Sequence, residues 1–267
     1  MIYKTINNLQ NKMKKVVSIL FLSSFILQTF GQLSSLEELD NKVRKYAKEA
    51  FDREEYDRII VDLNNDKNDD VIYSYTCGEL FCIRVFLNIN GQYEEKLYGL
   101  YSYFSLYSFY DKKRLHLYEY SCCGESPFFS NKIYEFNKTS AILVEDYIET
   151  NDDYVENRFL KPSKYLYKSY SVKIFNDDYN LRFSPDMEPF ELNDDIFFTC
   201  DTKTNIIAKI KANSIVKVLA EFKTKERKWL YVEVEKQSIK DKCRITDFES
   251  QAIRGWISGN YVEKNNL

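Results

Sequence analysis

Histidine is the scarcest chemically versatile residue of this chain. Its 267 residues include one histidine, His116, which stands between Leu115 and Leu117 in a tyrosine-rich segment. Peptidases that use a Cys–His pair or several histidine metal ligands need a second sequence motif that supplies the partner residues, and this sequence lacks one. Two carboxylates can hydrolyse a glycoside, but no motif singles out a pair among the 41 acidic residues. We therefore expect no enzyme activity, and we expect His116 to be a surface or hydrogen-bonded strand residue.

Glycine and proline are also scarce, with 7 and 4 residues, whereas aromatic residues make up 16% of the chain. This composition supplies material for a β-rich core, and only the last few residues resemble a disordered segment. The roughly 235 residues that follow the N-terminal segment suffice for one large domain or two ordinary ones.

The N-terminal segment, residues 1–31, has the features of a secretory signal peptide. Four lysines precede an apolar run at residues 16–27, and we expect cleavage near Gly31 or Gln32. A retained membrane anchor is the alternative, but the run is shorter than the roughly 20 residues that a spanning helix needs. No cysteine precedes Cys77, which excludes a lipid anchor on a cysteine next to the cleavage site.

A positive charge excess is absent. Removing the four lysines of the signal peptide from the 38 basic residues leaves 34 against 41 acidic residues, a net charge of −7. Proteins that bind nucleic acids or anionic membranes need a basic surface to release counterions. The charge therefore argues against both kinds of partner.

All six cysteines follow the signal peptide, and an even number in an exported chain indicates disulfides. Cys77 and Cys82 are separated by four residues between two strand-like runs, which favours a bond that closes a hairpin. The alternative is a pair of cross-links from these two cysteines to Cys122 and Cys123. The sequence leaves the pairing of these four residues open.

The helical pattern is confined to residues 33–58, with Ser34 or Ser35 as the N-cap. Seven strand-like runs follow, at residues 58–62, 71–76, 82–88, 94–106, 114–121, 132–137 and 140–148. Asn90-Gly91 predicts a hairpin turn between two of them. We therefore expect an antiparallel sheet that carries the helix, followed by a polar linker at residues 151–168.

An oxygen-rich loop, Asp62-Leu63-Asn64-Asn65-Asp66-Lys67-Asn68-Asp69-Asp70, precedes Val71 at the start of a strand. It resembles the calcium loop of integrin-type and VCBS-type repeats, in which alternate residues direct oxygen atoms at the ion. The resemblance implies Ca²⁺ held by the side chains of Asp62, Asn64, Asp66 and Asp70 and by the carbonyl of Asn68. Lys67 stands where these loops have glycine and disfavours the left-handed turn. An Asx-rich turn without metal is the alternative.

The C-terminal third carries a second pattern. Residues 180–185 read Asn-Leu-Arg-Phe-Ser-Pro, residues 254–262 read Arg-Gly-Trp-Ile-Ser-Gly-Asn-Tyr-Val, and strand-like runs at 206–219 and 228–235 lie between them. This order resembles a bacterial SH3-like (SH3b) domain, which opens on N-x-R-x-x-P and closes on G-W-[VI]-x-x-x-Y-[VIL]. The resemblance implies a small β-barrel at residues 170–264 that binds peptides or cell-wall material.

Two insertions, at residues 186–204 and 237–252, enlarge this pattern. Cys200 and Cys243 lie one in each insertion, so we expect a Cys200–Cys243 disulfide between them. The resemblance also implies a ligand groove between residues 182–185 and a hairpin at residues 223–229. Its expected ligand contacts are Arg182, Trp229, Tyr231, Trp256 and Tyr261. The alternative is that these aromatic side chains only pack the interior.

The sequence thus predicts a mostly β protein, α+β overall, with a signal peptide at 1–31, an α+β domain at 32–165 and an SH3-like barrel at 170–264. We expect an exported protein, periplasmic or extracellular, that binds cell-envelope peptide or glycan and is not integral to a membrane. The alternative is a periplasmic immunity or inhibitor protein that neutralises a toxin or hydrolase, which suits the acidic charge.

Overall fold

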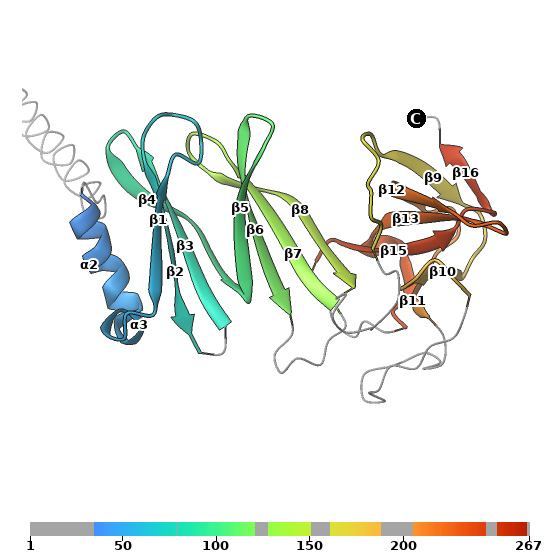
Figure 1. The fold of residues 1–267 in the computed structure, drawn as a ribbon, viewed down its shortest axis with the longest axis horizontal. Coiled ribbons are helices and arrows are strands. Elements are labelled where there is room, and N and C mark those ends of the chain that lie inside the picture. Colours follow the sequence, from blue (N-terminus) through green and yellow to red (C-terminus); the bar gives the residue numbers. More distant parts are fainter. Residues whose placement is uncertain are drawn as a thin grey trace, which may run out of the picture. The chain divides into compact units, whose positions relative to one another are not determined.

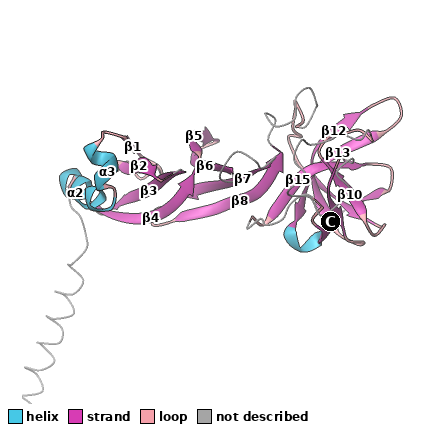
Figure 2. Cartoon of the chain, turned by 90° about the horizontal axis from the view of Figure 1, so that it is seen from below, coloured by secondary structure: helices cyan, strands magenta, loops and turns pink. Residues whose placement is uncertain are grey.

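The structure, a computed structural model, describes residues 35–78, 80–120, 128–150, 161–187, 205–243 and 250–265 (Figure 1). The predicted signal peptide, most of the first insertion, part of the linker and of the second insertion, and Cys122, Cys123 and Cys200 lie outside these residues. The described chain consists mostly of β-strands and begins with two α-helices (Figure 2). The predicted fold class is therefore confirmed.

The helical segment forms two short helices, α2 (Leu36–Tyr46) and α3 (Lys48–Asp52). Ser35 caps α2 as predicted, because its Oγ accepts a hydrogen bond from the backbone N–H of Glu38. Ala47 interrupts the helix with a φ of −120° and a ψ of 36°. The prediction of one helix over residues 33–58 is wrong here, because the apolar spacing continues through the bend.

A four-stranded sheet, in the order β1-β2-β3-β4, follows the helices. Its strands are β1 (Tyr56–Val61), β2 (Asp70–Cys77), β3 (Leu80–Ile89) and β4 (Gln92–Tyr101). Asn90 and Gly91 have φ values of 55° and 82°, as the predicted two-residue hairpin turn requires. Leu39 and Val43 of α2 share one buried cluster with Tyr73 of the sheet. This cluster confirms the predicted sheet that carries the N-terminal helix.

A second antiparallel group begins after Ser102, which divides the strand predicted at residues 94–106. Its strands are β5 (Tyr103–Phe109), β6 (Lys112–Tyr120), β7 (Phe128–Phe136) and β8 (Ala141–Thr150). These strands belong to a different sheet from β1–β4, so the one antiparallel sheet predicted over residues 58–148 is in fact divided between two sheets. The last strand, β8, pairs in parallel with the C-terminal strand β15 (Ala252–Ser258), where Tyr147 lies opposite Ala252.

The remaining strands, β9–β16, are called the C-terminal strands below. Besides β15 they are β9 (Tyr170–Ile174), β10 (Tyr179–Arg182), β11 (Ile206–Ile210), β12 (Ile215–Lys223), β13 (Lys228–Glu235), β14 (Ile239–Asp241) and β16 (Val262–Asn265), with a 3-10 turn at Lys236–Ser238. The strand-like run predicted at residues 206–219 is two strands, because residues 211–214 separate β11 from β12.

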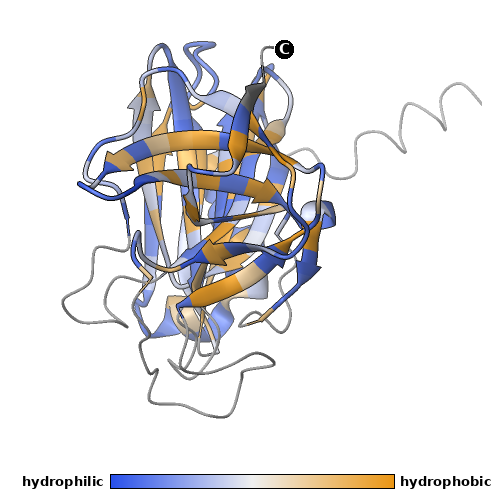
Figure 3. Ribbon diagram, turned by 90° about the vertical axis from the view of Figure 1, so that its right-hand side faces the viewer, coloured by the Kyte–Doolittle hydropathy of each residue, from blue (hydrophilic) through white to orange (hydrophobic). Residues whose placement is uncertain are grey.

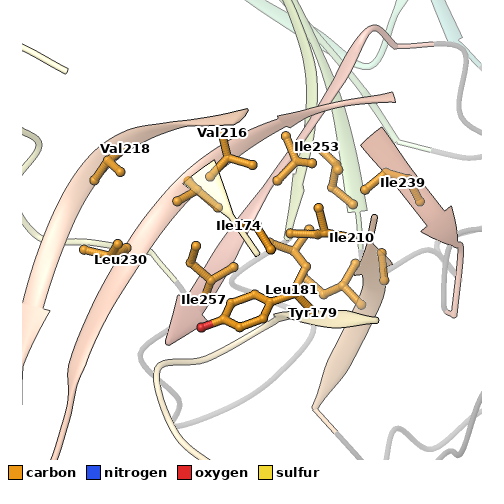
Figure 4. Packing of buried hydrophobic residues seen from close by; sticks show 14 of the residues in the cluster. Ile174, Tyr179, Leu181, Ile210, Val216, Val218, Leu230, Ile239, Ile253 and Ile257 are labelled. Carbon is orange, nitrogen blue, oxygen red and sulfur yellow. The ribbon is translucent and has the colours of Figure 1, made fainter. Parts of the chain in front are cut away.

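The C-terminal strands enclose an apolar core. Strand β15 pairs with β13 along its length and with β10 through Trp256 and Arg182, so the strands bend around one cluster. Ile174, Leu181 and Ile257, from three strands, lie together in this core (Figure 4). Apolar and polar positions alternate along the strands (Figure 3), as expected for strands with one buried face.

The chain divides into two compact units. The first unit comprises the described residues up to Cys77, together with Cys82–Tyr98 and Lys138–Ser140. The second unit comprises the rest, and so contains β5–β8 as well as the C-terminal strands. This division differs from the sequence prediction, which placed the boundary at residues 165–170.

Candidate binding site

The five predicted ligand contacts divide into buried and exposed residues. Trp229, Tyr231 and Trp256 are at most 2% exposed and pack in one cluster. Tyr231 of β13 lies opposite Trp256 of β15, with ring centroids 5.1 Å apart. These three rings therefore pack the interior, which is the alternative that the sequence left open. Tyr261 is 60% exposed.

Gly255 lies where β15 closely approaches β10, which leaves no room for a side chain. A Cβ atom at Gly255 would lie 2.9 Å from the carbonyl oxygen of Arg182 and 3.0 Å from Cδ1 of Ile207. Only glycine allows the backbones of β10 and β15 to approach this closely. The close approach places Trp256 directly opposite Arg182.

Arg182 is a buried cation with an unusual set of partners. Its side chain is 8% exposed, and Nη1 donates a hydrogen bond to Oδ1 of Asn205 at 2.5 Å. The amide of Asn205 in turn donates to Oδ1 of Asp186 at 3.0 Å. Among the described residues, no carboxylate forms an ion pair with Arg182. Burial and the neighbouring charge of Arg227 lower the pKa of Arg182, whereas the carboxylate of Asp186 nearby raises it.

Arg227 extends the positive charge to the surface of the hairpin between β12 and β13. Its guanidinium lies 5.5 Å from the ring centroid of Trp229, and Nη1 is 3.5 Å from Sδ of Met187. Tyr179 is near both Arg227 and Tyr261, and its hydroxyl donates to the backbone carbonyl of Ser258 at 2.7 Å. We call Arg182, Arg227 and Tyr261 the arginine surface. Arg227 was not predicted from the sequence.

The oxygen-rich loop forms a tight turn that its own side chains close. Lys67 has a φ of 71°, so the lysine accepts the left-handed conformation that glycine was expected to supply. The carboxylate of Asp62 accepts hydrogen bonds from the backbone N–H groups of Asp66 (3.1 Å) and Lys67 (2.9 Å). Asp66 in turn accepts from the N–H of Asn68 at 2.8 Å. These bonds are those of an Asx-rich turn.

Asp70, the last residue of this loop, is fully buried. Its two carboxylate oxygens accept from the N–H groups of Leu63 and Asn88, each at 2.8 Å. Burial raises the pKa of Asp70 to about 6. The loop carries oxygen atoms of the kind that bind a hard cation. Within the described chain, however, no group of three or more His, Cys, Asp or Glu side chains is arranged to hold a metal ion. Calcium binding stays a prediction.

His116 is a buried strand residue. Its Nε2 lies 2.9 Å from Oδ1 of Asn131, and its ring stacks on Tyr118 with centroids 3.8 Å apart. Burial lowers the pKa of His116, so the neutral form is favoured at pH 7. A hydrogen-bonded, stacked imidazole fits the expected role of a satisfied strand residue.

An ion-pair network that the sequence does not reveal crosses five strands of the second unit. Arg254 is at its centre, with Nη2 at 2.6 Å from Glu233 and 2.8 Å from Glu145. Arg114 lies 3.5 Å from Glu145 and 2.6 Å from Glu135. The guanidinium of Arg254 also covers the ring of Tyr147 at 3.3 Å. No local pattern predicts these pairs, because their members are far apart in sequence.

Two cysteine predictions can be compared with the structure. Cys77 and Cys82 form a disulfide with a Cα–Cα distance of 5.7 Å, which closes the β2–β3 hairpin as predicted. Cys243 is disulfide-bonded, while Cys122, Cys123 and Cys200 lie outside the described residues. The Cys200–Cys243 pairing therefore stays a prediction.

Comparison of the chain with protein-family models, with curated proteins and with solved structures gave no match. Within the part of the chain that the structure describes, no helix has the length and apolar character needed to cross a membrane.

Proposed function

We propose that this chain is an exported, non-enzymatic binding protein whose C-terminal strands, similar in sequence to SH3-like domains, recognise a carboxylate-bearing peptide or glycan of the cell envelope. The observation that carries the proposal is the arginine surface. Arg182 is a buried cation that donates to an amide, and Arg227 adds a second positive charge close to it.

A buried guanidinium that forms no ion pair with a carboxylate of the described residues is a costly arrangement for a fold. Burial of a charge destabilises the folded state unless hydrogen bonds and an opposite charge compensate it. Asp186 compensates Arg182 only from nearby, without an ion pair between the two, so a ligand carboxylate would add opposite charge and would accept hydrogen bonds from the planar guanidinium fork. The exposed ring of Tyr261 offers apolar contact area near Tyr179, which also neighbours Arg182 and Arg227. An anionic ligand is therefore favoured here.

The acidic net charge does not oppose this ligand strongly. At physiological ionic strength, charges separated by more than about 8 Å are largely screened in water. The two arginines of the arginine surface thus decide the local attraction. Export is supported by the Cys77–Cys82 disulfide, since such bonds persist mainly in oxidising compartments.

The test is a titration of the full chain with a labelled cell-wall stem peptide that ends in a free carboxylate, and with the same peptide amidated. Loss of a charged hydrogen bond of about 1.5–3 kcal/mol should weaken binding of the amide at least about tenfold. Mass spectrometry should recover both peptides uncleaved. Equal affinities, or cleavage of either peptide, would contradict the proposal.

Matched variants of one hairpin locate the site. Arg227→Gln should weaken binding of the free acid, because it removes the second positive charge while leaving Arg182 in place. Lys225→Gln, on the exposed turn of the same hairpin, should not. Retained affinity in Arg227→Gln, with native circular dichroism, would remove the arginine surface from the account.

A further inference from the structure

A second site in the same unit follows from the pairing of β8. Only Tyr147 and Ile148 of β8 pair with β15, although β8 begins at Ala141. Among the described residues, no strand pairs with residues 141–146 on the β15 side. Figure 1 shows β8 approaching β15 near one end only. Within the described ranges, six residues of strand edge, about 20 Å long, thus have no pairing partner on this side.

A cavity of about 620 Å³ adjoins this open edge. One wall is β8, at Val144, Glu145 and Asp146. The other wall comes from β12, β13, the 3-10 turn and the start of β15. The cavity therefore lies where β15 would continue beside β8 if it began earlier, which is the shape needed for an extended segment.

The end of this edge that is nearer to Ala141 is apolar. Ile142, Leu143 and Val144 are exposed by 45%, 44% and 38%. A register shift between Ile133 and Tyr134 of β7 places a bulge here, so three successive apolar side chains reach the surface together. Exposed apolar side chains that are contiguous on a strand edge are typical of a surface that another chain covers.

The other end carries charges of both signs. The cavity is lined by four acidic residues, Glu145, Asp146, Glu233 and Glu235, and by two lysines, Lys217 and Lys236. Glu145 and Glu233 are paired with Arg254, which leaves Asp146 outside that ion-pair network. Oδ1 of Asp146 is buried and has no hydrogen-bond partner in the described chain. A buried acceptor without a donor destabilises the fold, so a ligand that donates to Asp146 gains that energy on binding.

We propose that the open edge of β8 at residues 141–146 binds an extended segment of a partner protein in which apolar and basic residues alternate. The segment adds a strand to β8 and fills the cavity. Its backbone pairs with the β8 edge, its apolar side chains cover Ile142 and Val144, and a lysine or arginine donates to Asp146. This site shares no residue with the arginine surface.

The probe is an acetylated and amidated heptapeptide that alternates valine and lysine, compared with its valine–glutamine counterpart. Neither peptide carries a carboxylate, so neither reports on the arginine surface. The lysine peptide should bind the full chain at least about tenfold more tightly than the glutamine peptide, because a lysine brings a charged donor to Asp146. Equal binding of the two peptides, or no binding of either at millimolar concentration, would overturn the proposal.

Two readouts place the peptide. Asp146→Asn should weaken binding of the lysine peptide several-fold, whereas Asp111→Asn, on the exposed β5–β6 turn, should not. Hydrogen exchange of residues 141–146 should slow when the peptide binds, because strand addition protects edge amides. Unchanged exchange in this segment, despite binding, would show that the peptide sits elsewhere and would refute the strand addition.

Discussion

Arg254 provides the sharpest stability prediction. It is 8% exposed, and its Nε and Nη2 donate to Glu233 at 2.8 and 2.6 Å while Nη2 also reaches Glu145 at 2.8 Å. Burial by itself would lower the pKa of Arg254, but Tyr147 and Glu233 raise it above the ordinary range. Arg254→Met keeps most of the side-chain volume and removes the charge, so it isolates the electrostatic contribution.

The magnitude follows from what remains after the substitution. Removing one partner of a buried ion pair destabilises a protein by about 3–5 kcal/mol. Lys217 stays 3.3 Å from Glu233, and Arg114 stays 3.5 Å from Glu145, so neither carboxylate is left alone. We therefore expect a loss at the lower end, about 3 kcal/mol.

Urea unfolding followed by tryptophan fluorescence measures this loss. Both tryptophans of the chain, Trp229 and Trp256, lie in the C-terminal strands, so the signal reports the unit that holds Arg254. The double variant with Glu233→Gln should lose less than the sum of the single variants. The exposed Lys240→Met serves as a control with a much smaller effect. A loss below about 1 kcal/mol for Arg254→Met, as at an exposed pair, would refute the reasoning.

Three further outcomes are expected. The folded pKa of Asp70, about 6, exceeds the unfolded value of about 3.9, so ionisation of Asp70 destabilises the fold as the pH rises from about 4 to 6. In chelator, calorimetry should show the free energy of unfolding of the wild type falling over this window relative to Asp70→Asn, and parallel curves would contradict this. Gly255→Ala should destabilise the C-terminal strands by about 2 kcal/mol, because its Cβ meets the carbonyl of Arg182, and unchanged urea unfolding would count against that close approach. Ca²⁺ at a hundredfold excess over Kd should add about 2.7 kcal/mol to the free energy of unfolding and so raise the melting temperature. Asp66→Ala should abolish this rise. A melting temperature that is unchanged by Ca²⁺ and by chelator would show that the loop is an ordinary turn.

Local chemistry made parts of the fold predictable. The Asn90-Gly91 turn follows from the positive φ that both residues tolerate, and the Ser35 cap follows from an oxygen placed before the first helical turn. The Cys77–Cys82 disulfide follows from two cysteines on facing strand ends. Each of these features depends on residues that are neighbours in sequence.

The candidate sites were harder to predict because they depend on long-range pairing. The parallel contact between β8 and β15 brings Glu145 to Arg254, and no local spacing encodes a partner 109 residues away. The rings of Trp229 and Trp256 illustrate a second limit. Alternation along a strand predicts which residues share a face of the sheet. Both faces of β13 are buried, so the alternation does not distinguish a face that packs in the core from a face that binds a ligand.

The most direct test of the central claim is the nuclear magnetic resonance signal of the arginine Nε–H groups during titration of the full chain with the stem peptide. The account predicts that the Nε–H signals of Arg182 and Arg227 shift with the free-acid peptide and stay in place with the amide, since only a carboxylate pairs with the guanidinium. Signals that stay unchanged with the free acid at saturation, or that shift equally with the amide, would contradict the carboxylate-binding function.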